Sequence, residues 1–195
     1  MTAAGRMLET QRFADLSVAS ILSASGTAKG SFYFYFADKD DLLAALVREA
    51  VGTALDAAQA WTGADPAQDP VEALRAGTLA GARLWQAHAP VLRAVVEAAG
   101  TDSALDTLWR SQMDRFTDLA MRRLEGDLQA AAWLNGRDPL PIVTALTWLG
   151  ERVHYLAATN TPPFTSEAVV VEVLTDAWAL ALYGRRAAPG GPTSK

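Results

Sequence analysis

The spacing of apolar residues constrains this chain more than any other feature of its sequence. Alanine and leucine dominate, runs of β-branched residues are few, and apolar residues recur at steps of three and four almost throughout. Sustained alternation of apolar and polar residues, the mark of a half-buried strand, is absent. The chain therefore predicts an all-α protein of about nine helices, with no internal repeat of solenoid length.

Composition narrows the class of protein further. Half of the residues are apolar, which suffices for a full core, and the formal net charge is −5. The chain contains no cysteine, which excludes disulfides, thiolate nucleophiles and cysteine zinc sites. No apolar run approaches the roughly 20 residues of a membrane span, and no signal peptide is recognisable. We expect a soluble, cytoplasmic protein with no membrane partner.

Turn and capping residues divide the chain into helices. Ser17 can cap a helix because its hydroxyl can accept from the first turn, and Gly26 can end that helix with a positive φ. Thr27 can cap the next helix, and Asp38 the one after it. The expected helices cover residues 3–12, 18–25, 28–34, 39–61, 71–87, 90–100, 103–134, 142–159 and 167–183.

The segment GTAKGSFYFYFADKDDL, residues 26–42, places five consecutive aromatic residues beside small polar ones. A helix, a tight turn at Gly26 and a second short helix form a helix-turn-helix. The alternative is a helical hairpin with an aromatic core that touches no nucleic acid. The core expected around this hairpin comprises Phe13, Leu16, Val18, Ile21, Leu22, Phe32, Phe34, Phe36 and Leu42.

The outward residues of the second short helix are small, or end in a hydroxyl or amine. Such a face can enter a DNA major groove without steric conflict and still donate hydrogen bonds. The rings of Tyr33 and Tyr35 are expected to pack while their hydroxyls reach phosphates, and Lys39 can meet another phosphate. The predicted DNA-binding residues are Ser17, Thr27, Ala28, Lys29, Gly30, Ser31, Tyr33, Tyr35 and Lys39.

The sequence FADLSVASILSASGTAKGSFYFYFADKDDLLAALV resembles the DNA-binding region of the TetR family of transcriptional repressors. The shared features are Ser17–Val18, Gly26, the SFYFYF end of the recognition helix and the DKDDLL that follows. The resemblance covers residues 1–50 and implies a dimer on a double-stranded DNA operator. The family's first helix is normally longer and often follows a basic arm, so we expect either a longer N-terminus or fewer DNA contacts there.

The C-terminal half contains LWRSQMDRF, ALTWLGERVHYLA and DAWALALYG, which resemble mycobacterial repressors of an ethionamide-activating monooxygenase. The shared elements are Leu108–Trp109, Glu151–Arg152, Trp178 and Tyr183–Gly184. This resemblance implies pocket positions at Trp109, Phe116, Ala120, Thr147, Gly150, Glu151 and Trp178. The mostly apolar character of such a pocket predicts a small apolar or aromatic effector. Those repressors carry asparagine at the positions of Thr147 and Gly150, so hydrogen bonds to a ligand amide or carbonyl are expected to be lost there.

Aromatic residues follow one face of the helix expected over 103–134, and small and polar residues follow one stripe of the helix expected over 142–159. Large flat side chains opposite small ones, with Glu151 as a polar group, can leave a pocket for a small molecule. The alternative is that these aromatic residues only fill the core. The predicted ligand-binding residues are Trp85, Trp109, Met113, Phe116, Ala120, Thr147, Trp148, Gly150, Glu151 and Trp178.

Patterns for catalysis or metal binding are weak. Glu151 and His154 match half of a di-iron motif, but the second half is missing. The acidic DKDDL opens a helix, where capping explains the aspartates better than a metal does. No GxSxG, Walker or GxGxxG pattern occupies a strand-turn-helix. We expect no enzyme activity, no metal and no cofactor.

The helices expected over 142–159 and 167–183 are apolar on more than one side, which predicts a four-helix homodimer interface or complete burial within the monomer. We expect a DNA-binding domain over residues 1–45, a ligand-binding and dimerisation domain over 46–185 and a disordered tail over 186–195. The predicted function is a ligand-responsive transcriptional repressor, released from a palindromic operator by a small apolar effector. The alternative is a helical small-molecule-binding protein with a degenerate head that does not bind DNA.

Overall fold

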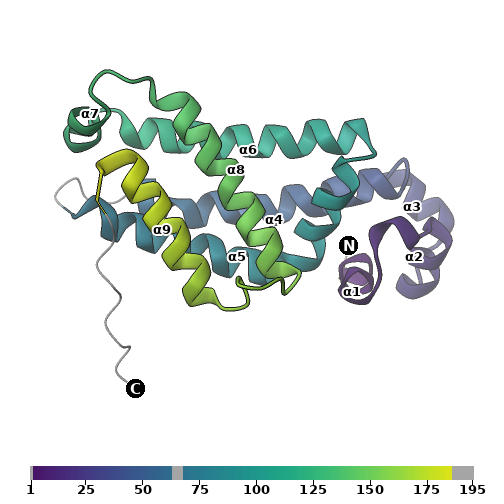
Figure 1. The fold of residues 1–195 in the computed structure, drawn as a ribbon. Coiled ribbons are helices and arrows are strands. Elements are labelled where there is room, and N and C mark those ends of the chain that lie inside the picture. Colours follow the sequence, from purple (N-terminus) through teal and green to yellow (C-terminus); the bar gives the residue numbers. More distant parts are fainter. Residues whose placement is uncertain (1, 63–67, 186–195) are drawn as a thin grey trace. The chain divides into compact units, whose positions relative to one another are not determined.

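The computed structural model describes residues 2–62 and 68–185, and every regular element in these two ranges is helical (Figure 1). The all-α prediction is therefore confirmed, whereas the predicted disorder of residues 186–195 lies outside the described residues. None of the described helices is long and apolar enough to cross a membrane. The elements are α1 (Thr2–Thr10), η1 (Phe13–Asp15, a 3₁₀ turn), α2 (Val18–Ser25), α3 (Lys29–Tyr35), α4 (Lys39–Thr62), α5 (Pro70–Ala99), α6 (Ser103–Leu124), α7 (Leu128–Leu134), α8 (Pro139–Ala158) and α9 (Glu167–Tyr183).

The chain forms two compact units. The first unit comprises Met1–Thr53 and Ala87–Gln112, and the second comprises Ala54–Gln86 and Met113–Lys195. The helices α4, α5 and α6 each contribute residues to both units. The unit boundaries therefore fall inside helices, and the expected division after residue 45 stays a prediction.

The helix-turn-helix lies in the first unit above a small apolar core. Phe13, Leu16, Ile21, Phe32 and Leu42 are buried there, as predicted. Three further members of the expected core, Val18, Leu22 and Phe36, are half-buried. The helix α1 packs against α2 and completes this head.

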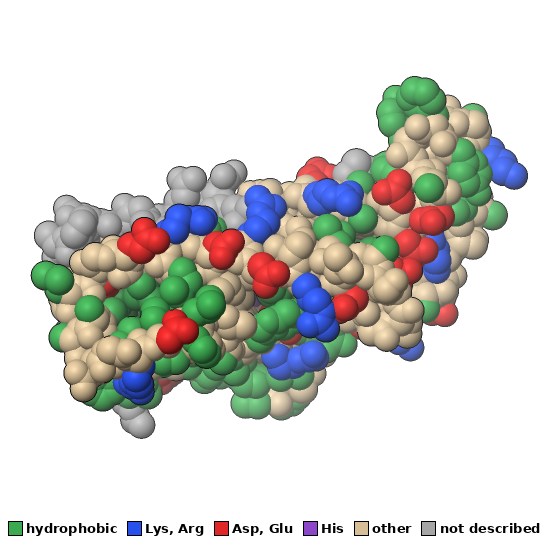
Figure 2. Space-filling model, turned by 90° about the horizontal axis from the view of Figure 1, so that it is seen from above, with side chains coloured by type: hydrophobic (Ala, Val, Ile, Leu, Met, Phe, Trp, Pro, Cys, Tyr) green, Lys and Arg blue, Asp and Glu red, His purple; other side chains and the backbone are tan. Residues whose placement is uncertain are grey.

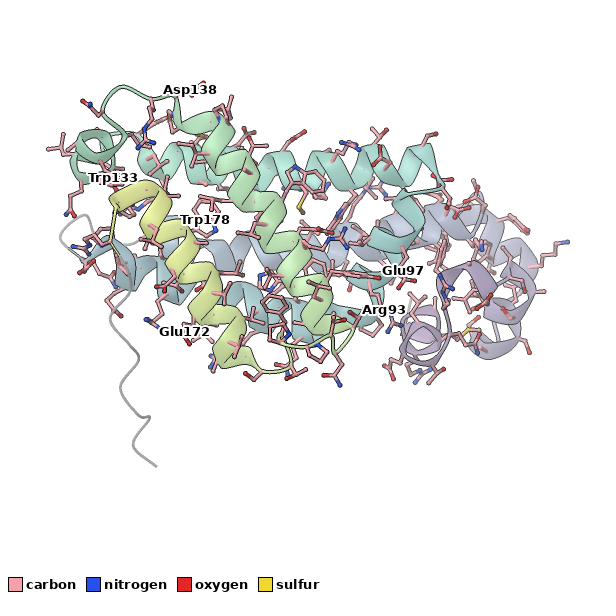
Figure 3. The ribbon with its side chains drawn as sticks, viewed as in Figure 1. Arg93, Glu97, Trp133, Asp138, Glu172 and Trp178 are labelled. Carbon is pink, nitrogen blue, oxygen red and sulfur yellow. The ribbon has the colours of Figure 1, made fainter. Side chains whose placement is uncertain are left out.

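The second part of α5 supports α1. Arg93 donates from Nη2 to the carbonyl oxygen of Leu8 at 2.9 Å. Glu97 forms ion pairs with both Arg93, with 3.9 Å between Nε and Oε1, and Arg12, with 3.8 Å between Nε and Oε2. Figure 3 shows Arg93 and Glu97 near the C-terminal end of α5. A charged network thus joins α1 to α5 within the first unit.

The caps of α2 follow the sequence prediction. The Oγ atom of Ser17 accepts from the Ser20 N–H at 3.0 Å, and the Ser20 Oγ accepts from the Ser17 N–H at 3.0 Å. This reciprocal pair satisfies two amides that the helix leaves unpaired. Gly26 ends α2 in the left-handed conformation, with φ 65°.

The predicted cap at Thr27 is wrong, whereas the cap at Asp38 is confirmed. Ala28 precedes α3 without a side-chain cap, and the N–H of Thr27 instead donates to Ser25 Oγ at 3.2 Å. The hydroxyl of Ser25 thus bridges the turn, and the helix begins one residue later than predicted. Asp38 accepts from the Asp40 N–H at 2.9 Å and from the following N–H at 2.8 Å.

The break predicted before Pro90 is a kink inside one helix. The helices expected over 71–87 and 90–100 are continuous in α5, where His88 departs from helical geometry with φ −118° and ψ 16°. Pro90 has no N–H to donate to the preceding turn and its ring crowds that turn, so the helix bends without ending.

The single helix predicted over 103–134 is in fact two helices. Gly126 turns the chain with φ 78°. Asp127 then caps α7, because its Oδ1 accepts from the N–H groups of Gln129 at 3.1 Å and Ala130 at 3.0 Å. The apolar spacing continues across this turn, and the pattern alone therefore conceals the break.

The core of the second unit forms where α5, α6, α7, α8 and α9 meet. The helix α9 packs against both α7 and α8, which Figure 1 shows beside it. Trp133 of α7 donates from Nε1 to the carbonyl oxygen of Ala181 at 3.2 Å, and Figure 3 shows it beside the end of α9. The most completely buried residues of this core are Ala73, Val143, Ala179 and Leu182.

We expect Gly26→Ala and Gly30→Ala to change stability in opposite directions. An added Cβ meets no other residue within 4 Å at either position, so packing changes in neither variant. Gly26 lies at φ 65°, where alanine costs on the order of 1 kcal/mol. Gly30 lies inside α3, where alanine is favoured by up to about 1 kcal/mol.

Thermal unfolding of these two variants, followed by circular dichroism, should give a lower midpoint for Gly26→Ala and a higher midpoint for Gly30→Ala than for the wild type. Equal midpoints for the two variants would contradict a left-handed residue at the turn.

Candidate nucleic-acid interface and ligand pocket

The helix α3 presents an exposed face in the first unit. Tyr33 is 48% exposed and Tyr35 70% exposed, so both rings lie partly in solvent. The Tyr33 ring still packs edge-on against the buried Phe32, with ring centroids 5.3 Å apart. The ammonium of Lys29 lies 5.9 Å from the centroid of the Tyr33 ring. The predicted DNA-binding residues with exposed side chains or backbone are Ser17, Thr27, Ala28, Lys29, Gly30, Ser31, Tyr33 and Tyr35.

Phe34 was expected in the core, and this prediction is wrong. Phe34 is 79% exposed, whereas Phe32 is 5% exposed. Phe32 and Phe36 are four residues apart and therefore share one side of the helix, with ring centroids 5.5 Å apart. Phe34 lies about 200° around the helix from Phe32, on the solvent side.

Lys39 is the predicted DNA-binding residue that the structure turns toward the protein. Its Nζ donates to the backbone carbonyl oxygen of Phe13 at 3.2 Å and lies 4.6 Å from the centroid of the Phe13 ring. The ammonium thus adds a second donor to the Phe13 carbonyl, which also accepts from the Leu16 N–H, and lies over an aromatic ring. Its contact with phosphate stays a prediction.

The charge around the head is balanced. Residues 1–50 hold five basic and six acidic side chains. Burial raises the pKa of Asp40, and the neighbouring carboxylates of Asp38 and Asp102 raise it further. On the face shown in Figure 2, acidic and basic side chains are interspersed. Any DNA contact therefore depends on the local cations and hydroxyls of α3.

A cavity of about 180 Å³ lies within the second unit, between α5, α6, α8 and α9. Its walls are mostly apolar and include glycines of α5 and α8. Trp178 reaches it from α9 (Figure 3). Eight of the ten predicted ligand-binding residues line this cavity, namely Trp85, Met113, Phe116, Ala120, Thr147, Gly150, Glu151 and Trp178.

The other two predicted ligand-binding residues do not line the cavity. Trp109 is buried, with 4% of its surface exposed, and belongs to the first unit. Trp148 is half-buried on α8 and lies one residue outside the stripe that Thr147 and Glu151 form. Trp109 therefore misses the cavity by its position along α6, and Trp148 by its position around α8.

Sequence reasoning missed the wall that α5 contributes. Leu74, Gly77, Thr78, Gly81 and Leu84 line the cavity together with Trp85. They recur at helical spacing, so a stripe of small residues ahead of the tryptophan was the available signal. His154 and Leu174 also line the cavity.

Two polar residues of the cavity wall lie close together on α8. The side chain of Glu151 is buried, and its Oε2 lies 3.9 Å from the Arg152 Nε. His154 is 9% exposed, and its ring stacks on Trp85 with centroids 5.7 Å apart. Burial lowers the pKa of His154 to about 4, so the imidazole is neutral at pH 7. Within the described ranges, no group of three histidine or acidic side chains could hold a metal ion.

Comparison with known proteins agrees with this geometry. Residues 1–46 match the family model of bacterial regulatory proteins of the tetR family, and residues 74–184 match that of the transcriptional regulator EthR, C-terminal domain. The chain is 26% identical over 184 residues to the HTH-type transcriptional regulator EthR of Mycolicibacterium smegmatis, across 94% of this chain and 84% of that protein.

The HTH-type transcriptional regulator EthR of Mycobacterium tuberculosis is 26% identical over 185 residues, across 94% of this chain and 85% of that protein. The EthR of Mycobacterium bovis shows the same values. Both family resemblances predicted from the sequence are confirmed. The chain belongs to the TetR family of transcriptional regulators, and its C-terminal half is of the EthR type.

Proposed function

We propose that this protein is a dimeric repressor that binds a palindromic operator through α3 and is released when a small apolar effector enters the cavity. The main support for this proposal is that a chain with an exposed α3 face also holds an apolar cavity of about 180 Å³. An engineered cavity of ~150 Å³ binds benzene, so this volume accommodates a substituted aromatic ring. The family consists of regulators, which agrees with the lack of catalytic motifs.

The exposed side chains of α3 suit contact with DNA. Lys29 brings a cation to its N-terminal end, and Ser31 and Tyr33 bring hydroxyls. Such groups donate to phosphates and base edges. Gly30 carries no side chain and has open space around it, so the backbone can approach the duplex closely there.

The outer faces of α8 and α9 suit a dimer interface. Leu149 is 40% exposed, Val173 40% and Leu180 41%. Val173 and Leu180 are seven residues apart and therefore lie on one side of α9. Two helices from each subunit can form a four-helix interface that buries these side chains. A two-fold dimer can then place two copies of α3 in successive major grooves, ~34–36 Å apart.

The helix α5 offers a route between effector and DNA. Its first part lines the cavity with Gly81 and Trp85, and its second part holds α1 through Arg93 and Leu8. An effector shifts the equilibrium only if it prefers the conformation that does not bind DNA.

The charge of the head favours a second candidate function. Residues 1–50 carry no positive excess, and the ammonium of Lys39 is engaged by Phe13. A protein that binds the small molecule without DNA would account for both observations. We favour the repressor because the amine and hydroxyls of α3 remain exposed.

Lys29→Ala should weaken binding to labelled DNA from the region upstream of the protein's own gene. The affinity should fall at least about tenfold, and the slope of log affinity against log salt should become shallower by about 0.9 per subunit, because one phosphate contact is lost. Fluorescence anisotropy at several salt concentrations measures both quantities.

Arg83→Ala is the matched control for this loss of charge. Arg83 is exposed in the second unit, where it lies 3.6 Å from Glu167, and its removal should leave both quantities unchanged. Operator binding by Lys29→Ala with the wild-type affinity and slope would remove Lys29 from the interface. An absence of DNA binding by the wild type at low salt would favour the second candidate function.

Val173→Glu should convert the dimer into a monomer, because it places a charge at the centre of the proposed interface. Val173 is exposed in the single chain, so the fold should remain intact. Sedimentation equilibrium gives the mass. The control is Leu128→Glu on α7, where the side chain is 82% exposed outside the α8–α9 face, and that variant should keep the wild-type mass. A dimeric Val173→Glu protein would place the interface elsewhere.

Gly150→Trp should abolish the binding of n-propylbenzene. An added Cβ at Gly150 meets no other residue within 4 Å, so the indole can extend into the open cavity. Equilibrium dialysis measures the affinity. Gly52→Trp adds the same ring at an exposed position with open space and should bind n-propylbenzene as the wild type does. Unchanged binding by Gly150→Trp would argue against this cavity as the ligand site.

A further inference from the structure

Among the described residues, both hydroxyl groups that line the cavity, those of Thr78 and Thr147, already have partners within the protein. The Oγ1 of Thr78 lies 2.8 Å from the Oγ1 of Thr175, so one hydroxyl donates to the other. The Oγ1 of Thr117 donates to that of Thr147 at 3.3 Å, and Thr147 donates to the carbonyl oxygen of Val143 at 3.0 Å. These hydroxyl protons are committed, and a ligand would have to break existing bonds to receive them.

His154 differs from these residues. It is nine-tenths buried and lines the cavity, and neither ring nitrogen is hydrogen-bonded to another residue in the part of the chain that the structure describes. Its ring stacks on that of Trp85, with an interplanar angle of 19°. A ring N–H that faces the cavity is available to a ligand, and a ligand oxygen that accepts from it gains a hydrogen bond.

The helix α5 leaves the Nε2 atom of His154 accessible. A Cβ on Gly81 would lie 3.4 Å from Nε2, the position of an ordinary van der Waals contact. Because Gly81 has no side chain, no side chain of that residue covers this edge of the ring, and a ligand atom in the cavity can approach Nε2 beside the Gly81 backbone. Trp85, four residues later on the same helix, covers the face of the imidazole. The two residues together hold the ring in place and leave its edge free.

The charges around His154 favour an uncharged ligand. The imidazole is neutral at pH 7, with one donor and one acceptor nitrogen. Glu151 lies three residues earlier on α8 and lines the same cavity. Its side chain is buried and already interacts within the protein. A charged ligand of either sign would have to leave water for a mostly apolar wall.

We infer that the effector is an uncharged, largely apolar molecule with one oxygen acceptor, and that Nε2–H of His154 donates a hydrogen bond to that oxygen beside Gly81. This inference rests on the proposed function of the cavity as the effector site. It assigns the ligand a chemical class and an orientation, with the oxygen toward α5 and α8 and the apolar part along the aromatic wall.

Three compounds with one skeleton test this inference in the full-length protein. Propiophenone carries a carbonyl, n-propylbenzene a methylene and 1-phenylpropylamine an ammonium at the same carbon. Equilibrium dialysis at pH 7.5 gives the three affinities. His154→Phe keeps a flat ring against Trp85 but removes both nitrogens, so the affinity for the ketone should fall about tenfold, as the loss of one hydrogen bond predicts, while that for the hydrocarbon changes less than twofold.

Gly81→Ala is the second variant, because its methyl group would occupy the space beside Nε2 that the carbonyl oxygen needs. It should weaken binding of the ketone more than binding of the hydrocarbon, and it decides the question alone if circular dichroism shows that His154→Phe does not fold.

Equal changes in affinity for both compounds in the folded variants would overturn the role of His154 and leave the cavity as a ligand site. Binding of the ammonium compound more tightly than the ketone would overturn the uncharged class. No binding of any compound to the wild type would overturn this inference and the proposed site together, whereas operator binding tests the repressor function separately.

Discussion

Pro90 is the constraint that gives α5 its two roles. Its missing N–H interrupts the hydrogen bonding of the helix, and His88 accordingly leaves helical geometry. The part before the kink supplies Gly81 and Trp85 to the cavity, whereas the part after it supplies Arg93 to the support of α1. An unbroken helix would fix both parts on one straight axis. The kink instead lets each part pack in its own unit while the chain joins them covalently.

The helices α8 and α9 perform a similar double duty through their opposite faces. On α8, Gly150 and His154 face the cavity while Leu149 is exposed. On α9, Leu174 lines the cavity while Val173, its neighbour in sequence, is exposed. The same two helices therefore separate a ligand from a partner subunit in the proposed dimer. Such a dimer would cover both sides of each helix, in keeping with sequences that are apolar on more than one side, which a helix with one buried stripe does not require.

The sequence predicts local features well where one residue type has one physical role. Ser17 as a cap and Gly26 as a left-handed residue are of this kind, and both are confirmed. The predicted burial of Phe34 is wrong because a helix of seven residues has too few apolar positions to show which side faces the core. Neighbouring aromatic residues then cannot be assigned to the inside or the outside from the sequence. The break at Gly126 was not predicted because the apolar residues keep their helical spacing across it. The glycines of α5 were missed because a cavity is made partly of absent side chains, which a search for aromatic stripes does not detect.

The distribution of polar groups in the cavity determines what the wall can recognise. Threonines supply hydroxyls, but that of Thr78 is hydrogen-bonded to Thr175 on α9 and that of Thr147 to the backbone of its own helix. Such pairs stabilise the contacts between helices and make the wall effectively apolar to a ligand. His154 has no such partner on α5, because Gly81 lies at the edge of its ring and Trp85 stacks on the face of the ring. In the proposed site, apolar surface supplies affinity for many molecules of suitable size, while the Nε2–H of His154 selects among them by the position of one oxygen.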